Sequence, residues 1–317
     1  MKKFIITSLL FAIFAAIFYT CTLFLWGNYA YTILKPNVQY KLGDYGHSFT
    51  RFKEVKNVRD VDILFLGSSH AFRGFDTRIF TKHGFNTFNL GSPSQTPMQT
   101  LTLVRRYLDQ IQPKSVIYEV YPSTLTIDGV EASLDIVSND KNDVHSLNMA
   151  LKTKHIMTYN TLLYAATRDR LHLNESFSEP TFKENKARGG DTYIEGGYVE
   201  KELRYFKPKQ NFLGYIVPDK YQLATFGEVI DEIRKRDIEL MLVFAPLTKH
   251  RYCTYLNNDD YDSLMTSYAH YYNFNEMMDL NDSLHFYDYQ HLNQSGVELF
   301  NLKLIDVIKK NKNKWYE

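Results

Sequence analysis

Cysteine is scarce in this chain, whose 317 residues include only Cys21 and Cys253. Cys21 lies in an apolar run near the N-terminus and Cys253 lies far beyond it, so a disulfide between them is not expected. The chain is therefore not one of the small scaffolds that disulfides hold together, and its cysteines give no metal or redox signal. Its stability has to come from a hydrophobic core.

An excess of charge of either sign is also absent. Lysine and arginine number 37 and aspartate and glutamate 36, so no global field favours nucleic acid or another polyanion as a partner. The composition is that of an ordinary globular protein, with 44% hydrophobic and 23% charged residues. The length is sufficient for one sizeable α/β domain with an insertion.

A long uncharged run lies near the N-terminus. No charged residue occurs from Phe4 to Trp26, and at about 1.5 Å per residue a helix of this length crosses a hydrocarbon core of about 30 Å. Lys2 and Lys3 precede the run, and positive residues favour the cytoplasmic side. We therefore expect a single-pass anchor with its N-terminus inside. The alternative is a cleaved signal peptide, but the run exceeds the usual apolar length of about 7–15 residues.

Apolar strand patterns alternate with helical patterns through most of the remaining sequence. This alternation predicts a parallel sheet with helices on both faces, and an active site at the carboxyl ends of the strands. The expected strands are Val61–Leu66, Phe85–Leu90, Ser115–Val120, Ile238–Ala245 and Glu276–Leu280. The expected helices run from Thr96 to about Gln110, over Tyr221–Arg236 and Asp259–Tyr272, and from Ser295 onward, with Val297, Phe300, Leu304 and Ile308 on the buried side.

The pattern divides the chain into an anchor, a stem and one catalytic domain. We expect residues 1–26 to form the anchor, 27–58 the stem and 59–317 the domain, with an insertion at 124–215. The insertion contains a helical stretch around Thr161–Arg170 followed by a glycine-bearing loop. Because it follows the third strand, it should emerge on the catalytic face, as a lid, as a glycan-contacting cap or as a decoration without function.

Three polar residues in two distant segments have the chemistry of a catalytic triad. The first expected strand ends at Gly67-Ser68-Ser69, and Asp288 and His291 stand three residues apart near the C-terminus. A serine hydroxyl is a weak nucleophile unless an imidazole takes its proton and a carboxylate orients the imidazole. Ser69, His291 and Asp288 can fill these roles.

These segments resemble the SGNH/GDSL hydrolase family, in which a serine after the first strand pairs with a late Asp-x-x-His motif. The resemblance implies a flavodoxin-like, three-layer core with a five-stranded parallel sheet. It places Gly67-Ser68-Ser69 on the family's Gly-Asp-Ser block, with Ser69 as the nucleophile. It also places Asn89-Leu90-Gly91 on the second block, which implies that the amides of Gly91 and Ser69 bind the oxyanion.

The family's third block is missing. Where the family has Gly-x-Asn-Asp after the next strand, this chain runs from Val116 to Pro122 without an asparagine. The side-chain amide that completes the family's oxyanion hole is therefore absent, and loss of such a donor typically costs about 10²–10³ in turnover. Glu119 is a poor replacement, since an anion would repel a developing oxyanion.

Among family members, the Gly-Ser-Ser opening and the N-terminal run resemble the membrane-anchored branch with the alginate O-acetylation and D-alanyl-lipoteichoic acid proteins. That resemblance implies a bacterial, inner-membrane esterase or O-acyltransferase whose domain lies on the periplasmic or extracellular side. It implies no cofactor, an acylated or acceptor glycan as substrate, and a membrane O-acyltransferase as partner. The missing third-block amide leaves open an inactive glycan-binding or scaffolding subunit.

Other polar residues near these motifs have two interpretations each. His70 and Arg73 follow the nucleophile and could contact substrate, His70 alternatively packing beneath the loop and Arg73 alternatively being solvated. Lys249 and Arg251 follow the fourth strand and could bind an anionic glycan or phosphate, or alternatively be solvated charges. Asp282 and His285 extend the late motif into a spacing that could suggest metal ligands, but the intervening aromatic residues argue against a regular helix there. We expect no metal.

Overall fold

The computed structural model describes residues 1–171, 173, 184–207 and 213–311. The chain forms two compact units, each built from two stretches of sequence. One contains Met1–Leu42 and Ser133–Lys183, and the other contains Gly43–Ala132 and Glu184–Glu317. The helix α6 (Val130–Asn139) begins in the second unit and continues into the first.

The second unit contains a five-stranded sheet in the order β2-β1-β3-β7-β8, and every neighbouring pair is parallel. This is the strand order of a flavodoxin-like sheet. The expected α/β fold class is therefore confirmed. The strands are β1 (Ile63–Leu66), β2 (Thr87–Asn89), β3 (Ser115–Glu119), β7 (Glu239–Phe244) and β8 (His270–Asn273).

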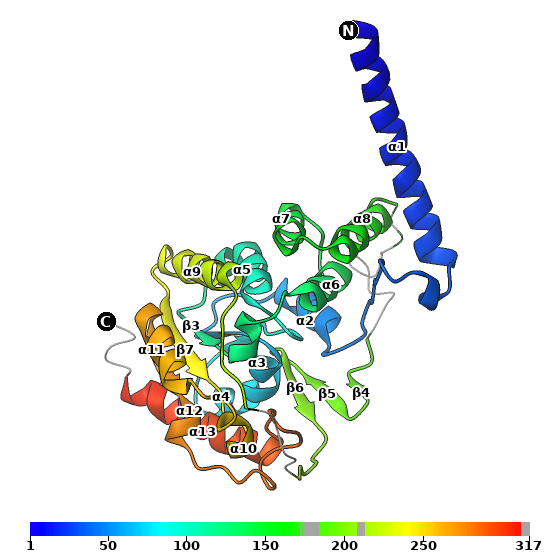
Figure 1. The fold of residues 1–317 in the computed structure, drawn as a ribbon. Coiled ribbons are helices and arrows are strands. Elements are labelled where there is room, and N and C mark those ends of the chain that lie inside the picture. Colours follow the sequence, from blue (N-terminus) through cyan, green and yellow to red (C-terminus); the bar gives the residue numbers. More distant parts are fainter. Residues whose placement is uncertain (172, 174–183, 208–212, 312–317) are drawn as a thin grey trace. The chain divides into compact units, whose positions relative to one another are not determined.

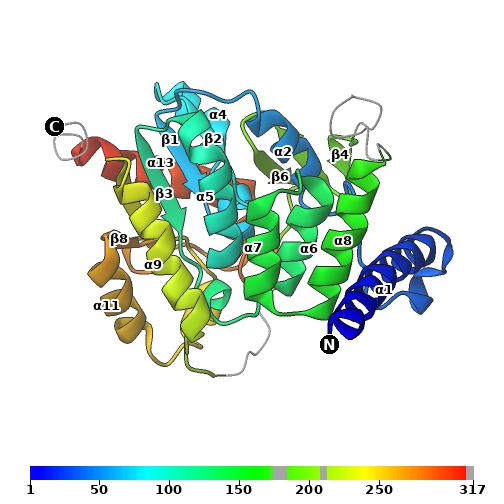
Figure 2. The same cartoon turned by 90° about the horizontal axis from the view of Figure 1, so that it is seen from above.

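Helices cover both faces of this sheet (Figures 1 and 2). On one face, α5 packs against α9 and α11 against β8, and aromatic pairs such as Tyr118–Phe226 and Phe244–Tyr261 fill the layer between helices and sheet. On the other face, Phe65 and Phe75 join the side chains of α13 in one buried cluster. The helices are α3 (Ser69–Gly74), α4 (Thr77–Lys82), α5 (Pro97–Ile111), α9 (Lys220–Arg234), α11 (Asn258–Tyr268), α12 (Phe274–Met277) and α13 (Gln294–Lys310).

Two helix predictions agree closely with the structure. Thr96 and Gln99 form the capping box that opens α5, with Pro97 in its first turn. The expected inward side of α13 is buried as predicted, but the helix begins at Gln294 because Asn293, rather than Ser295, accepts the Gly296 amide at its N-terminus. The residues on that buried side are Val297, Phe300, Leu304 and Ile308.

The predicted fifth strand at Glu276–Leu280 is wrong. The edge strand is β8, which begins at His270, only two residues after α11 ends at Tyr268. Ala269 between them is extended, so the helix expected to reach Tyr272 stops early. The first residues of the predicted strand fall in α12 instead.

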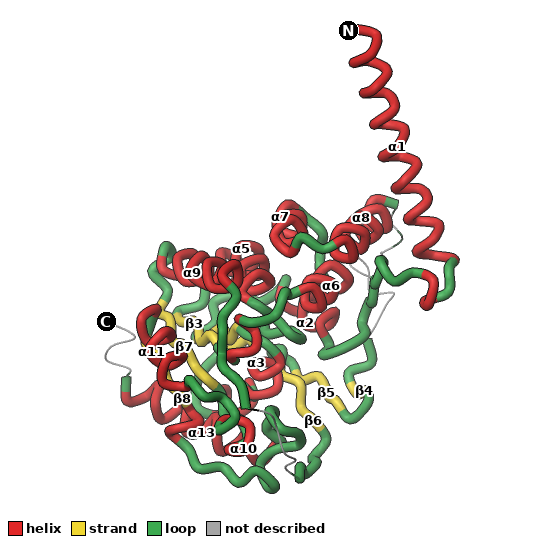
Figure 3. Tube along the Cα trace, in the orientation of Figure 1, coloured by secondary structure: helices red, strands yellow, loops and turns green. Residues whose placement is uncertain are grey.

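A second, three-stranded sheet is antiparallel and lies where the sequence pattern predicts a loop (Figure 3). It consists of β4 (Ala187–Arg188), β5 (Asp191–Ile194) and β6 (Tyr198–Lys201). β6 packs against α3, the helix that starts with Ser69. Part of the expected insertion 124–215 therefore belongs to the surroundings of the candidate site.

The expected stem, residues 27–58, is divided between the two units. Its second half contains the helix α2 (Ser48–Val55), whose Phe49, Phe52 and Val55 are buried in the second unit. Before it lies the 3-10 helix η1 (Thr32–Leu34). Another 3-10 helix, η2 (Pro122–Leu125), follows β3, and α10 (Lys249–Tyr252) follows β7.

The first unit is helical and includes the apolar N-terminal helix α1 (Lys2–Tyr29). α1 is long and apolar enough to cross a membrane, with a mean hydropathy of 2.3, and a signal sequence would have the same properties. α7 (Val144–Thr153) packs against α8 (Ile156–Arg170), and α8 packs against α1.

Candidate active site

Ser69 is the first residue of α3, immediately after the turn that ends β1. Gly67 makes this turn with φ 135°, a conformation that side chains rarely adopt. A Cβ at Gly67 would also lie 2.8 Å from the Cβ of Glu119 and 2.9 Å from its carbonyl oxygen. The turn therefore requires glycine, and it presents Ser69 at the carboxyl end of the sheet.

Asp288 and His291 lie in a tight loop that precedes α13. The Tyr287 N–H donates to the His291 carbonyl at 3.1 Å, and the Asn293 N–H donates to the His285 carbonyl at 3.0 Å. One oxygen of Asp288, Oδ1, accepts the backbone N–H groups of Gln290 and His291, both at 2.8 Å. These bonds fix the carboxylate and leave its other oxygen for the imidazole.

Ser69, His291 and Asp288 form a continuous hydrogen-bonded triad. Ser69 Oγ lies 2.8 Å from His291 Nε2, and His291 Nδ1 lies 2.8 Å from Asp288 Oδ2. Burial opposes the ionisation of Asp288, but His291 and the two backbone N–H groups outweigh it and lower the pKa of this carboxyl. Asp288 can then hold the tautomer in which Nε2 accepts the serine proton.

Two aromatic rings stack on the imidazole of His291. Tyr287 stacks on it with centroids 5.5 Å apart and planes at 4°, and His70 stacks on it at 4.8 Å and 24°. His291 is only 9% exposed. The ring therefore cannot swing far from Ser69, which is the geometry that proton transfer needs.

His70 lies beneath the site and does not face solvent. It is 4% exposed, and its ring contacts Tyr121 with centroids 4.0 Å apart. Its Nε2 lies 3.1 Å from the Gln290 carbonyl and its Nδ1 3.3 Å from Ser68 Oγ. Burial, followed by the neighbouring His291, lowers the pKa of His70 well below its usual value, so the ring is neutral at pH 7.

Asn89 and Gly91 lie beside the nucleophile, but their polar groups are engaged in hydrogen bonds within the protein. Asn89 Nδ2 donates to the Ala71 carbonyl at 2.7 Å, and Asn89 Oδ1 accepts the Gly91 N–H at 3.1 Å. The Gly91 amide can therefore serve an oxyanion only if it leaves Asn89. Among the described residues the Ser69 N–H has no hydrogen-bond acceptor, so it is the free amide at this position.

Arg73 is buried in an ion pair with Asp191 and is not solvated. Its guanidinium donates two hydrogen bonds to Asp191, at 3.0 and 2.8 Å, and Asp191 also accepts from Lys201 at 2.8 Å. Its carbon Cζ lies 5.9 Å from the centre of the Tyr287 ring. Arg73 thus supports the ring that stacks on His291, and its charge is already neutralised by Asp191.

The residues after β7 form hydrogen bonds with the residues around the triad loop and β3. Arg251 donates to the Tyr255 hydroxyl at 2.9 Å, and that hydroxyl donates to Tyr121, whose ring lies on His70. Asp282 accepts the backbone N–H groups of Lys249 and His250, at 2.7 and 3.1 Å. No cluster of three histidine, cysteine, aspartate or glutamate residues suited to a metal occurs in the part of the chain that the structure describes.

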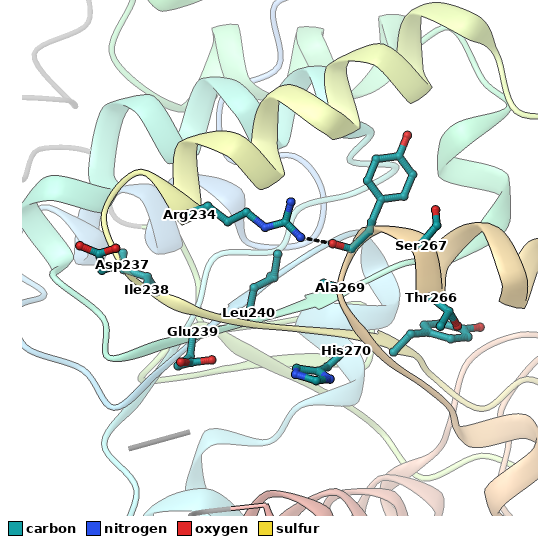
Figure 4. Close-up of a pocket in the computed structure, with 11 residues that line it drawn as sticks. Arg234, Asp237, Ile238, Glu239, Leu240, Thr266, Ser267, Ala269 and His270 are labelled. Atoms are coloured by element: carbon teal, nitrogen blue, oxygen red, sulfur yellow. Dashed lines mark hydrogen bonds between the residues drawn. The ribbon is translucent and has the colours of Figure 1, made fainter. Parts of the chain in front are cut away.

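Two hollows in the second unit lie away from the triad. The larger, of about 700 Å³, is at the amino ends of β7 and β8 and is lined by Arg234, Glu239 and His270 (Figure 4). A smaller one, of about 310 Å³, lies beside Cys253 and Met278. Neither contains a residue of the triad. The amino ends of parallel strands are also the edge at which such sheets do not usually bind ligands.

Three supporting contacts of the site cannot be found by reading motifs. Tyr287 stands in the sequence only as an aromatic residue between polar ones, and Asp191 falls in the segment predicted to be a loop. Tyr121 donates to the Gln290 side chain at 2.8 Å, which ties the end of β3 to the Asp-x-x-His loop. The one available signal is the pair of short segments around Gly196-Gly197, which is typical of a β-hairpin.

Comparison with known proteins adds little at the level of sequence. The chain matches no protein-family model and no curated protein. Among solved structures it is similar to a protein from Bacteroides fragilis described as an acylhydrolase, with 11% identity, a TM-score of 0.42 and coverage of 84% of this chain and 98% of the other. It is also similar to a GDSL-like lipase from Bacteroides thetaiotaomicron, with 10% identity, a TM-score of 0.40 and coverage of 84% and 99%.

Proposed function

We propose that this protein is a serine-dependent acyl-ester hydrolase or O-acyltransferase of the SGNH/GDSL type, anchored in the bacterial inner membrane and acting outside the cytoplasm on exported polysaccharide. The observation that carries the proposal is the triad, in which Ser69, His291 and Asp288 are joined by two 2.8 Å contacts. Ser69 attacks the acyl carbonyl, His291 takes its proton and returns it to the leaving alcohol, and Asp288 stabilises the charged imidazole.

Hydrolysis and transfer differ only in the second half of this reaction. Water releases the acyl group in a hydrolase, whereas a sugar hydroxyl accepts it in a transferase. The free Ser69 amide and the engaged Gly91 amide describe an oxyanion site with few donors, which suits an acyl-enzyme that waits for its acceptor. The resemblance to polysaccharide-acylation proteins makes a glycan the proposed acceptor and a membrane O-acyltransferase the proposed partner.

The kinetics of an activated acetyl ester test this proposal. We expect a burst of released alcohol close to one equivalent of protein, followed by slow turnover. The good leaving group of an activated ester speeds acylation, whereas deacylation by water has no such help in an oxyanion site that lacks one donor worth roughly 3–4 kcal/mol. An oligosaccharide acceptor should speed the slow phase. Steady turnover without a burst, unaffected by any glycan, would favour a plain esterase. No release above the buffer rate would favour the inactive binding or scaffolding subunit.

The packing of α1 supports retention of the N-terminal helix. Tyr19 donates to Asn160 Oδ1 of α8 at 2.7 Å, and Asn28 Oδ1 accepts from Tyr164 at 3.1 Å and from Arg168 at 2.9 Å. A side chain at Gly27 would collide with the Tyr164 ring. Cleavage of α1 would remove these contacts with α8 and expose this part of the first unit. A signal peptide that is removed after export does not form part of the folded domain.

A topology experiment follows from the anchor. A reporter that is active only outside the cytoplasm should function when fused after residue 317, and the protein should stay with membranes after a carbonate wash. The physical reason is that Lys2 and Lys3 hold the N-terminus inside while the uncharged run spans the bilayer. Release of a shortened soluble species would mean that the helix is a cleaved signal.

A further inference from the structure

A buried chain of side chains joins the two segments that carry the triad. Glu119 ends β3 and is 1% exposed. Its Oε2 lies 3.3 Å from Ser68 Oγ, and Ser68 Oγ lies 3.3 Å from His70 Nδ1. His70 Nε2 lies 3.1 Å from the carbonyl of Gln290, a residue between Asp288 and His291. The chain therefore runs from the neighbour of the nucleophile to the loop of the base.

The direction of each hydrogen bond follows from donor and acceptor chemistry. A carbonyl only accepts, so the bond to Gln290 requires a proton on His70 Nε2. In neutral His70, Nδ1 is then an acceptor, and the Ser68 hydroxyl must donate to it. The single proton of Ser68 is thereby used, so the contact between Ser68 and Glu119 needs a proton from the carboxyl. The two lone pairs of Ser68 Oγ are then also used, because the His70 backbone N–H donates to the same oxygen at 3.3 Å.

We propose that Glu119 is a protonated carboxylic acid that acts as a positioning residue, donating to Ser68 and so holding His70 and the Asp288–His291 loop in register with Ser69. The proposal rests on the proposed serine-dependent function. It gives Glu119 a role at the strand end where the resembling family has its third-block asparagine. As an acid it adds no negative charge beneath the developing oxyanion.

The surroundings of Glu119 favour this neutral form. Burial raises its pKa to about 8, against the lowering effect of the Ser68 hydroxyl and of the backbone amides of Tyr121 and Ser68. Two tyrosines interact with it, Tyr118 of β3 and Tyr261 of α11, and burial keeps both protonated by raising the pKa of each hydroxyl. In the described part of the chain no lysine or arginine forms an ion pair or a hydrogen bond with Glu119.

Among the described residues, the other charged groups near these hydrogen bonds interact with His70 and not with Glu119. His70 interacts with His291, Asp288 and Arg251, besides its bond to Gln290. An alternative proton arrangement, with an imidazolium at His70 and a carboxylate at Glu119, would place two unlike charges in a buried site while both pKa shifts oppose them. When Glu119 loses its proton, the Ser68 hydroxyl turns toward the carboxylate. His70 Nδ1 then loses its donor, and the hydrogen bonds no longer connect Glu119 to the Asp288–His291 loop.

The test compares Glu119→Gln with Glu119→Ala in the full chain purified in detergent. Glutamine can donate to Ser68 at every pH, whereas alanine cannot donate at all. We expect wild-type kcat/KM on an activated acetyl ester to fall at least tenfold as pH rises through the region of 8. Glu119→Gln should keep activity within about threefold at neutral pH and lose this alkaline decline, and Glu119→Ala should lose about 10–100-fold at all pH values.

Glu232→Gln is the matched control, since Glu232 lies on α9 and bonds to Arg105 and Arg236 away from the site. It should leave the pH profile unchanged. An alkaline decline that persists in Glu119→Gln, or equal losses in the glutamine and alanine variants at neutral pH, would overturn the proposal.

Infrared spectroscopy tests the protonation state without any activity. The difference spectrum between the wild type and Glu119→Gln at neutral pH should contain the carbonyl band of a neutral carboxylic acid, and the wild-type band should disappear at alkaline pH. A carboxylate band at neutral pH would overturn the inference even if the enzyme is active. Conversely, a wild-type chain that neither turns over esters nor reacts at Ser69 would end the proposed function, while the infrared result would still decide the state of Glu119.

Discussion

Ser69→Ala should reduce turnover of an activated acetyl ester by roughly 10⁴–10⁶-fold, because it removes the hydroxyl that contacts His291. Labelling by a serine-directed fluorophosphonate should disappear with it, and a chelator should not affect labelling of the wild type. Both measurements are made on the full chain in detergent. Retention of either activity or labelling in Ser69→Ala would remove Ser69 from the role of nucleophile.

Ser68→Ala is the natural control, since it changes the adjacent residue of the same type. Its hydroxyl caps α3 and bonds to His70 and Glu119, but it does not contact His291. We expect a loss of about 10–100-fold through poorer orientation, with fluorophosphonate labelling still measurable. Equal losses in the two alanine variants would mean that the assignment of roles between them is wrong.

Asp288→Asn should lower turnover by about 10⁴-fold while leaving the fold intact. Asp288 Oδ1 accepts two backbone N–H groups, so an asparagine would keep its carbonyl oxygen there and turn its NH₂ toward His291 Nδ1. That NH₂ donates, and it would force Nδ1 to accept and Nε2 to carry the proton. The imidazole could then no longer accept the proton of Ser69.

Asp282→Asn is the matched control for this substitution. Asp282 also accepts two backbone N–H groups, those of Lys249 and His250, but it contacts no imidazole of the triad. We expect turnover within about threefold of the wild type and a stability loss of about 1 kcal/mol. Steady-state kinetics and thermal unfolding of both variants make the comparison. A similar drop in both would show that Asp288 acts only by holding its loop.

The sequence is sufficient to predict four of the five strands of the central sheet and the three residues that meet at its carboxyl end. The strands β1, β3 and β7 are short apolar runs that are almost entirely buried, and buried strands of a parallel sheet have this pattern. The triad can be predicted because each member follows a recognisable local signal. A glycine turn after a strand indicates Ser69, and a spacing of three before a helix indicates Asp288 and His291.

The edge strand and the small sheet escape prediction because their patterns are weak. β8 is half-buried and directly continues the aromatic pattern of α11, so no polar break separates helix from strand. β5 and β6 have only four residues each and are only partly buried. Such short, partly polar strands are formed by tertiary packing more than by local preference.

The burial and charge state of individual side chains cannot be predicted from the sequence for a different reason. The sequence predicts an anion at Glu119, but the charge state of this group depends on burial by residues from other elements. It predicts that Arg73 contacts substrate or is solvated, but its ion-pair partner Asp191 lies 118 positions away in the sequence. The pKa of a polar group depends on whether it is buried and on which groups it pairs with. When those neighbours are far away in the sequence, local patterns do not identify them.

The large sequence separation within the triad determines when the site is completed during synthesis and folding. Ser69 and His291 are 222 positions apart, and the ribosome finishes the nucleophile long before the base. Contacts of such high sequence separation form late in folding, after the chain between them has closed its loops. A nascent or truncated chain that ends before the Asp-x-x-His loop contains all five strands of the central sheet but lacks the base, so its serine is not activated. Under the proposed function, reaction at Ser69 begins only once this loop has joined the folded sheet.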